Sequence, residues 1–205
     1  MYKNIIKRII DLIFAIVSLV VFSPIFVLAC VAIKLDSRGP IFFQQRRLGK
    51  DKKEFKVIKF RSMVVNAPKE RPTRMLRNPD EYVTKVGKVL RITSIDELPQ
   101  LFNIIVGHMS VVGPRPVIPK EYELINKRVK GDVYSVRPGL TGWAQVNGRD
   151  EISIDTKVQL DSDYVENLSF LMDVKCIWRT IPLVFRADDA PSVEAERVGQ
   201  LEEKI

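Results

Sequence analysis

The sequence predicts an α+β protein in which a hydrophobic N-terminal segment precedes one β-hairpin and several short helices. Residues 9–33 form a long hydrophobic run, residues 40–63 alternate like two strands around a charged turn, and the rest reads as helical stretches between Gly- and Pro-rich turns. With 205 residues and 46% hydrophobic content, we expect one domain with an appendage.

The hydrophobic run, IIDLIFAIVSLVVFSPIFVLACVAI, carries Asp11 as its only charge and is long enough to span a bilayer. It has no cleavage site of the secretory type, so we expect it to be retained. Basic residues flank both ends, which favours placing both ends on the same, cytoplasmic side. Ser23 and Pro24 predict a break near the middle, with the Ser23 hydroxyl as a partner for the carbonyl freed near Val20. A re-entrant helix-break-helix and a kinked transmembrane helix both fit these features.

The hairpin is predicted from IFFQQRRLG and EFKVIKFRSM, which are joined by the turn GKDKK. Residues 64–81 read as a loop, residues 121–131 as an amphipathic helix ending near Gly131, and residues 137–150 as a Gly-rich loop. Residues 156–185 read as two helices, the second bent or ended by Pro182. We divide the chain into an anchor (1–36), a compact catalytic domain (37–186) and an acidic, flexible tail (187–205).

Charge and composition limit which ligands the protein can bind and which kinds of catalytic or metal site it can have. The net charge of +8 is uneven, because residues 38–91 hold 16 Lys and Arg against 5 Asp and Glu, a local surplus of +11. Such a patch favours phosphate, anionic lipid or nucleic acid. His108 is the single histidine, which excludes a histidine-based triad or zinc site. Cys30 and Cys176 are far apart in sequence and are expected to be free thiols.

The stretch SIDELPQLFN, residues 94–103, places Asp96 and Glu97 side by side before Pro99. Neighbouring residues on a helix point about 100° apart, so the two acids are not expected to share one task. One explanation is structural, because Ser94 and Glu97 match a capping box with Asp96 near the positive end of the helix dipole. The other explanation is that the two carboxylates divide a catalytic task.

Four motifs occur in order behind the hydrophobic segment: KFRSM (59–63), SIDELPQLFNIIVGHMSVVGPRP (94–116), RPGLTGWAQVNGR (137–149) and FLMDVK (170–175). Together they resemble the small monotopic phosphoglycosyl transferases of bacterial sugar-transferase type, the PglC-like enzymes. The resemblance extends from Tyr2 to about Phe185. It implies a re-entrant anchor with the break at Ser23 and Pro24, and interfacial amphipathic helices around the catalytic domain.

The resemblance also implies an activity: transfer of a phosphosugar from a UDP-sugar to polyprenyl (undecaprenyl) phosphate, giving a polyprenyl diphosphosugar and UMP. The family's Asp-Glu pair falls on Asp96 and Glu97, and its basic residues fall on Lys59, Arg115 and Arg149. A carboxylate can form an acyl-phosphate, so Asp96 is the predicted nucleophile. Glu97 is the predicted ligand of the cofactor Mg²⁺, and the three basic residues are predicted to bind substrate phosphate. Asp173 fits either a ligand or a helix cap.

This activity would be the first membrane step in making an O-antigen, capsule, exopolysaccharide or glycoprotein glycan. The expected location is the cytoplasmic face of a bacterial inner membrane, with an anionic lipid bilayer and no nucleic acid among the partners. A homodimer is left open. The alternatives to an enzyme are a membrane-tethered basic module that binds anionic lipid or nucleic acid, and a structural membrane protein; neither explains DELPQ and NGR.

Overall fold

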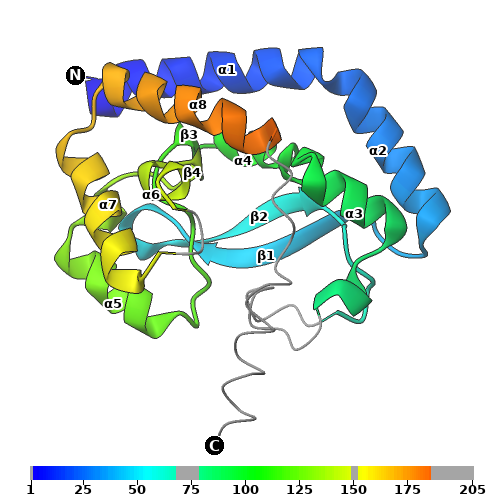
Figure 1. The fold of residues 1–205 in the computed structure, drawn as a ribbon. Helices are drawn as coiled ribbons and strands as arrows, with labels where there is room; N and C mark the ends of the chain where they lie inside the picture. Colours follow the sequence, from blue (N-terminus) through cyan, green and yellow to red (C-terminus); the bar gives the residue numbers. More distant parts are fainter. Residues whose placement is uncertain (1, 68–78, 149–151, 186–205) are drawn as a thin grey trace, which may run out of the picture.

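The computed structural model describes residues 2–67, 79–148 and 152–185 (Figure 1). Its first layer is a long N-terminal helix, α1 (Lys7–Val21), which lies across the top of the molecule beside the last helix, α8 (Phe170–Phe185). Beneath them lie a short helix and two small sheets, and the remaining helices enclose the sides. The mixture of helix and sheet confirms the predicted α+β class.

The hydrophobic segment is a bent pair of helices. A π-helical turn, Tyr2–Ile6, leads into α1, and α2 (Ser23–Asp36) follows after Phe22 at an angle of 62°. No single helix within the described ranges is long and apolar enough to cross a membrane, but this bent pair meets that test by length and composition. The predicted break is confirmed: Pro24 lies in the first turn of α2, and the Ser23 hydroxyl donates to the Val20 carbonyl at 2.8 Å.

The predicted hairpin is confirmed as β1 (Phe42–Leu48) and β2 (Glu54–Phe60), which pair in antiparallel register. The register sets Phe43 opposite Lys59 and Gln45 opposite Val57. A short 3-10 turn, Lys50–Lys52, joins the strands with Asp51 in the left-handed region at φ 56°. Since side chains alternate along a strand, one face of the hairpin carries Lys59 together with every second residue of β1.

The remaining elements flank the hairpin. In chain order they are η4 (Pro79–Tyr82), α3 (Lys85–Ile92), η5 (Ile95–Glu97), α4 (Gln100–Ile105), β3 (Ser110–Val112), α5 (Tyr122–Lys130), η6 (Val133–Ser135), β4 (Gly139–Thr141), α6 (Trp143–Val146) and α7 (Ile154–Glu166). The helix predicted before Gly131 is α5, with Gly131 as its C-cap.

Two local predictions were wrong. Residues 139–146, expected to be a loop, contain β4, which pairs in parallel with β3, and the single turn of α6. The α8 helix does not end at Pro182 but continues to Phe185, whereas a bend at Pro182 stays a prediction. Residues 187–205, predicted to be an acidic flexible tail, and most of the predicted 64–81 loop lie outside the described residues.

The core lies between α1 and the hairpin. Ala15 of α1 is fully buried against residues of α4, β3 and α8, including Ile104, Val112 and Cys176. Polar groups on the same face of α1 are also satisfied: Asp11 Oδ1 accepts a hydrogen bond from the Val111 amide at 3.0 Å. The first half of the hydrophobic segment is therefore packed directly on the rest of the fold.

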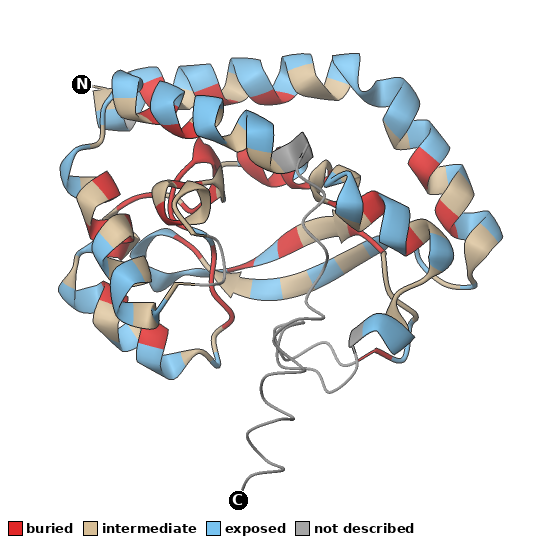
Figure 2. Ribbon diagram, in the orientation of Figure 1, coloured by how far each residue is buried: buried red, intermediate tan, exposed pale blue. Residues whose placement is uncertain are grey.

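The opposite face of the helical layer is apolar and exposed (Figure 2). It is built from large aliphatic and aromatic side chains, with exposed fractions up to 84% for Leu35 and 74% for Trp178. The members on α1, α2 and α8 include Ile9, Ile13, Ile16, Val17, Val20, Val27, Leu28, Val31, Leu35, Leu171, Val174 and Trp178. We call this set the apolar outer face.

Candidate active site

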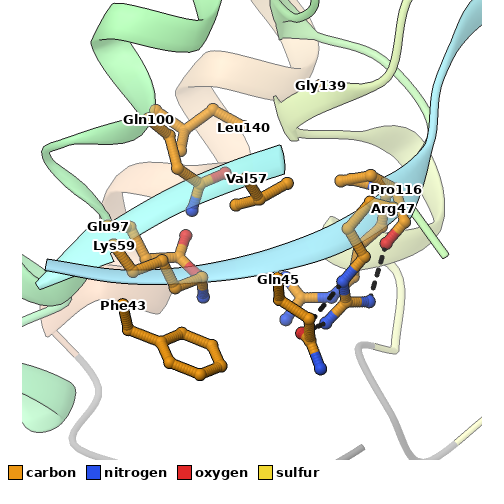
Figure 3. Close-up of a pocket in the computed structure, with 11 residues that line it drawn as sticks. Phe43, Gln45, Arg47, Val57, Lys59, Glu97, Gln100, Pro116, Gly139 and Leu140 are labelled. Carbon is orange, nitrogen blue, oxygen red and sulfur yellow. Dashed lines mark hydrogen bonds and ion pairs between the residues drawn. The ribbon is translucent and has the colours of Figure 1, made fainter. Parts of the chain in front are cut away.

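Lys59 and Glu97 form the centre of the candidate site. Lys59 is the sixth residue of β2, and Glu97 ends the 3-10 turn η5. The Lys59 ammonium donates to Glu97 Oε1 at 2.5 Å, and both side chains are about one-quarter exposed, at 23% and 24%. The ion pair is therefore formed within the protein yet remains open to a ligand (Figure 3).

Asp96 lies behind this pair. Its Oδ2 is 4.0 Å from the Lys59 ammonium, and the residue is 9% exposed, so it is more enclosed than Glu97. The structure thus brings Lys59, Asp96 and Glu97 together, as the sequence predicted. The two neighbouring acids do share one contact, because the lysine approaches both of them.

The capping-box explanation for the acidic pair is wrong. Ser94 precedes η5 in the left-handed conformation at φ 56°, and its side chain makes no cap hydrogen bond. The Glu97 amide instead donates to the Ser94 backbone carbonyl at 3.1 Å. Pro99 acts as the N-cap position of the next helix, α4. A three-residue 3-10 turn has little dipole, so the acids are held by Lys59 rather than by a helix end.

The environment separates the two carboxylates electrostatically. Burial raises the pKa of Asp96 to about 6, because the opposing attraction of Lys59 does not offset desolvation and the neighbouring Glu97 adds repulsion. Burial would also raise the pKa of Glu97, but Lys59 and Arg115 together more than offset it, so that pKa lies below its ordinary value. The charge of Asp96 therefore depends on Lys59 and the nearby arginines rather than on a helix dipole.

A pocket of about 370 Å³, part of it open to solvent, lies over the hairpin face that carries Lys59. Glu97 and Arg115 also line it, so two of the predicted phosphate-binding residues face the same space as the predicted metal ligand. The other lining residues are Phe43, Gln45, Arg47, Val57, Gln100, Pro116, Gly139 and Leu140 (Figure 3). The concave, positively charged surface suits an anionic ligand.

Arg47 and Gln45 are pocket residues that sequence reasoning missed. Arg47 donates to the Pro116 carbonyl at 2.9 Å and, through Nε and Nη2, to Gln45 Oε1 at 3.1 and 2.6 Å. The signal was present in the predicted hairpin, because alternation places Phe43, Gln45 and Arg47 on the face that carries Lys59. The sequence had suggested only a membrane-flanking role for Arg47.

Arg115 is placed by a buried ion pair. The Arg128 guanidinium on α5 contacts Asp161 of α7 at 2.5 Å, with side chains 2% and 1% exposed, and also donates to the Arg115 carbonyl at 2.8 Å. The loop after β3 is thereby fixed while the Arg115 side chain stays exposed at the pocket. Breaking a buried pair of this kind is costly, so the loop is firmly held.

Gly139 lines the pocket because two backbone segments meet there. A Cβ at this position would lie 2.1 Å from the Gly113 nitrogen, closer than any side chain permits. The Gly139 amide donates to the Pro114 carbonyl at 3.0 Å, next to Arg115. The glycine is required by this close approach.

The other predicted site residues have different outcomes. Arg149 lies outside the described residues, and its phosphate-binding role stays a prediction. Ser23 and Pro24 form the bend between α1 and α2 and do not line the pocket. Within the described structure the Asp173 carboxylate makes no cap contact; it accepts hydrogen bonds from Tyr2 and Lys7, both at 2.5 Å, and from Tyr164 at 2.7 Å.

The carboxylates of the site fit a magnesium ion whose coordination would be completed by the substrate. Mg²⁺ commonly binds one or two carboxylates together with substrate phosphates. Glu97 and Asp96 supply adjacent carboxylates, and the described residues contain no cluster of three or more His, Cys, Asp or Glu that could hold a metal by themselves. An ion held by Glu97 would therefore depend on phosphate oxygens for its remaining ligands.

Comparisons with known proteins identify the family of the chain. The family model described as bacterial sugar transferase matches residues 2–187. An exopolysaccharide production protein, ExoY, of Sinorhizobium fredii is 43% identical over 87% of this chain and 84% of its own length.

Longer relatives match over the same region. A UDP-glucose:undecaprenyl-phosphate glucose-1-phosphate transferase of Escherichia coli is 40% identical over 87% of this chain and 40% of its own length. A UDP-N-acetylgalactosamine-undecaprenyl-phosphate N-acetylgalactosaminephosphotransferase of Aeromonas hydrophila is 39% identical over 86% and 43%. These relatives are named as transferases, which favours the enzyme over the binding module and the structural membrane protein. The chain belongs to the bacterial sugar transferase family.

Proposed function

We propose that this protein transfers a phosphosugar from a UDP-sugar to polyprenyl (undecaprenyl) phosphate, giving a polyprenyl diphosphosugar and UMP. The observation that carries the proposal is Lys59 in contact with Glu97 at 2.5 Å and with Asp96 at 4.0 Å, beside a pocket that Arg115 lines. Phosphoryl transfer needs a nucleophile, neutralisation of charge and a grip on phosphate oxygens, and these residues supply all three. Relatives named as undecaprenyl-phosphate sugar phosphotransferases support the same reaction.

In the first half-reaction, an Asp96 carboxylate oxygen attacks the β-phosphorus of the UDP-sugar. The new bond joins Asp96 to the phosphosugar, and the bond between the β-phosphorus and the bridging oxygen breaks, so that UMP leaves with the electron pair. In the second half, a phosphate oxygen of the polyprenyl phosphate attacks the same phosphorus and the Asp96 carboxylate is released. The raised pKa of Asp96 suits this role, because a more basic carboxylate is a better nucleophile once ionised.

The surrounding residues would neutralise and orient the phosphates. Glu97, kept ionised by Lys59 and Arg115, would hold Mg²⁺, which when bound offsets the negative charge of the diphosphate. Arg115 can donate two parallel hydrogen bonds to phosphate oxygens, and Arg149 would add a second such grip. Lys59 would offset part of the repulsion between the two carboxylates. The product would enter glycoconjugate synthesis, and the similarity to an exopolysaccharide production protein favours an exopolysaccharide.

The test is release of UMP from a panel of UDP-sugars by the purified full-length protein in detergent, with Mg²⁺ and without lipid acceptor. A covalent intermediate predicts a stoichiometric burst of UMP and an intact-protein mass increased by one phosphosugar. Addition of polyprenyl phosphate should discharge the adduct and restore turnover. Verified turnover with no adduct at any time would contradict the covalent route and favour direct attack by the lipid phosphate.

We further propose a monotopic placement on the cytoplasmic face of a bacterial inner membrane. The apolar outer face would lie in the lipid, with the bent pair α1–α2 entering and leaving on one side. The basic residues after α2 would contact anionic headgroups. This position would let the acceptor keep its isoprenoid tail in the bilayer while its phosphate reaches the pocket.

Accessibility labelling tests the placement. Single cysteines introduced near Lys3 and Lys34, in a chain lacking Cys30 and Cys176, should both react from the cytoplasmic side. Replacing Ser23 and Pro24 together by Leu should favour a straight, spanning helix, because the hydroxyl contact to Val20 and the proline are then removed. Labelling of the Lys3 position from the opposite side in the otherwise unaltered chain would contradict the re-entrant arrangement.

A further inference from the structure

Asn103 joins the two elements that carry the candidate catalytic groups. It lies on α4 and is 2% exposed. Its side-chain oxygen accepts a hydrogen bond from the Ile58 amide at 2.9 Å, and its side-chain nitrogen donates to the Lys56 carbonyl at 2.8 Å. Both partners are backbone groups of β2, on either side of Val57.

These contacts close the free edge of β2. In a two-stranded antiparallel sheet, alternate residues direct their N–H and C=O groups away from the partner strand. Lys56 and Ile58 do so here, because β1 pairs with the other edge of β2. The carboxamide of Asn103 supplies one donor and one acceptor, as a third strand would. The register of β2 against α4 is thereby fixed at one residue.

Asn103 is itself held firmly. Its backbone carbonyl accepts from the His108 and Met109 amides at 3.0 and 3.1 Å, which ties the end of α4 to the turn before β3. Leu101 and Ile104, on the same helix, are buried in the core with Val57 of β2. Because α4 is held in this way, the Asn103 side chain fixes the position of β2 relative to a rigid helix.

We infer that Asn103 is a positioning residue that sets Lys59 against Asp96 and Glu97. Lys59 directly follows Ile58 on β2, and the acids end the turn η5 that leads through Pro99 into α4. The hydrogen bonds of Asn103 thus connect β2, which carries Lys59, to α4, which directly follows the turn that carries the two carboxylates. The inference rests on the proposed function, since it gives Asn103 a part in the same reaction without contact with substrate.

An apolar substitution tests the tether. Asn103→Leu keeps the side-chain size but removes both hydrogen bonds to β2. We expect faster hydrogen–deuterium exchange at the Ile58 amide in the substrate-free protein. We also expect kcat for UMP formation, measured per folded enzyme, to fall roughly tenfold to a hundredfold, because small displacements of reacting groups are costly. KM for the UDP-sugar should change less, since Arg115 and the other lining residues remain.

Asn167→Leu is the control, because it makes the same substitution at an exposed position away from the site. The Asn167 amide also donates to a backbone carbonyl, that of Asp163 at 2.9 Å, but it lies at the end of α7 and does not line the pocket. This variant should exchange normally at Ile58 and keep the kcat of the unaltered enzyme. A similar loss of kcat in both variants would overturn the inference, because the effect would then be general destabilisation.

Asn103→Asp provides a conditional rescue. A neutral carboxyl has the donor and acceptor of the amide, whereas an ionised one loses the donor and opposes the Lys56 carbonyl. Burial raises the pKa of a carboxyl above its usual range, so the change from the rescuing neutral form to the ionised form should occur at a pH that can be tested. The ratio of kcat to that of the unaltered enzyme should approach one at low pH and decline as pH rises.

Using the ratio at each pH cancels the titration of groups common to both proteins. The charged or titratable side chains on neighbouring elements include Lys56 and Lys59 on β2, Asp96 and Glu97 on η5, Arg8 and Asp11 on α1, His108 in the turn after α4, and Arg137, which donates to the Gly107 carbonyl of that turn. A ratio that stays flat or rises with pH would overturn the assignment of the two hydrogen bonds.

The proposed function and the inference about Asn103 can be contradicted by different results. If the unaltered protein releases no UMP from any UDP-sugar, the proposed function fails, and the inference of a part in that reaction fails with it. If the unaltered enzyme is active but Asn103→Leu leaves exchange at Ile58 unchanged, only the inference fails. Faster exchange with full kcat would also overturn it, because the tether would then have no bearing on the site.

Discussion

Two lysine–carboxylate contacts of equal length, both within the described residues, have different surroundings. Lys59 meets Glu97 at 2.5 Å with side chains 23% and 24% exposed, whereas Lys7 meets Asp173 at 2.5 Å with side chains 10% and 8% exposed. Around Asp173, two tyrosine hydroxyls complete the coordination of the carboxylate. Around Glu97, a second carboxylate and two arginines add charge beside a pocket.

The difference distinguishes a structural ion pair from a candidate catalytic one. The Asp173 carboxylate receives three donors and joins α8 to the N-terminal segment and, through Tyr164, to α7. Lys59 contacts two carboxylates, whose combined charge one lysine cannot neutralise, and it lines the pocket. A contact distance alone therefore does not reveal function; the remaining partners and the access to solvent do.

The largest effect is expected for Asp96→Asn. An amide is not a competent nucleophile, so kcat for UMP release should fall by roughly 10³-fold or more, about 4 kcal/mol, and no phosphosugar adduct should form. Folding should be retained, because the amide is close in shape. Intact-protein mass spectrometry tests for the adduct, and circular dichroism tests whether the variant is folded. Asp155→Asn on the surface of α7 is the control and should keep normal turnover.

Asp173→Leu should instead act on stability. It leaves the Lys7 ammonium buried without its partner, a change that costs about 3 kcal/mol or more in the free energy of unfolding. Chemical denaturation measures the loss, while kcat per folded molecule should be preserved. Replacing Lys7 by Met in the same protein should recover much of the stability, since no unpaired charge then remains. Loss of catalysis without loss of stability would reverse the comparison.

The pH profile provides a further distinction. Attack requires ionised Asp96, so kcat should fall about tenfold per pH unit below the pKa of about 6. For folding, the sign is opposite: a raised carboxyl pKa stabilises the protein at low pH, and this contribution is lost as pH rises through about 6. Lys59→Met should move the acidic limb upward, because the main attraction that lowers both carboxyl pKa values is removed. If the acidic limb of the pH profile stays at the same pH in Lys59→Met, Lys59 does not lower the pKa of Asp96.

The smallest effect is expected for Arg115→Lys. A lysine keeps the charge but not the planar pair of donors, so KM for the UDP-sugar should rise about tenfold with kcat less affected. Steady-state kinetics measures this. Lys120→Arg, an exchange of one base for the other outside the pocket lining, is the control. Normal KM in Arg115→Lys would exclude a two-donor grip on phosphate by this side chain.

Local sequence patterns predicted the elements that depend on nearby residues. Alternation of residues gave both strands of the hairpin, and the Ser23–Pro24 pair gave the break with its hydroxyl contact to Val20. The candidate site was predicted through Lys59, Asp96, Glu97 and Arg115, chiefly because the motifs resemble a family. Arg47 could have been added from strand alternation alone.

The role of a single polar residue was harder to predict. Asp173 was left between ligand and cap because its partner Lys7 is 166 positions away in sequence. Asn103 gave no signal, since its bonds to Lys56 and Ile58 depend on how α4 packs against β2. The parallel pairing of β3 with β4 was missed for the same reason, as each strand is too short to show a pattern.

The sequence by itself determined the bend of the hydrophobic segment, the hairpin and the chemical types gathered in the DELPQ region, because these follow from backbone preference and residue chemistry over a few positions. Only the tertiary structure decided which acid is enclosed and which faces the pocket, and which lysine–carboxylate contact is sealed. Burial and the approach of Lys59 and Arg115 come from segments outside the DELPQ region, and these set the pKa values of the two acids.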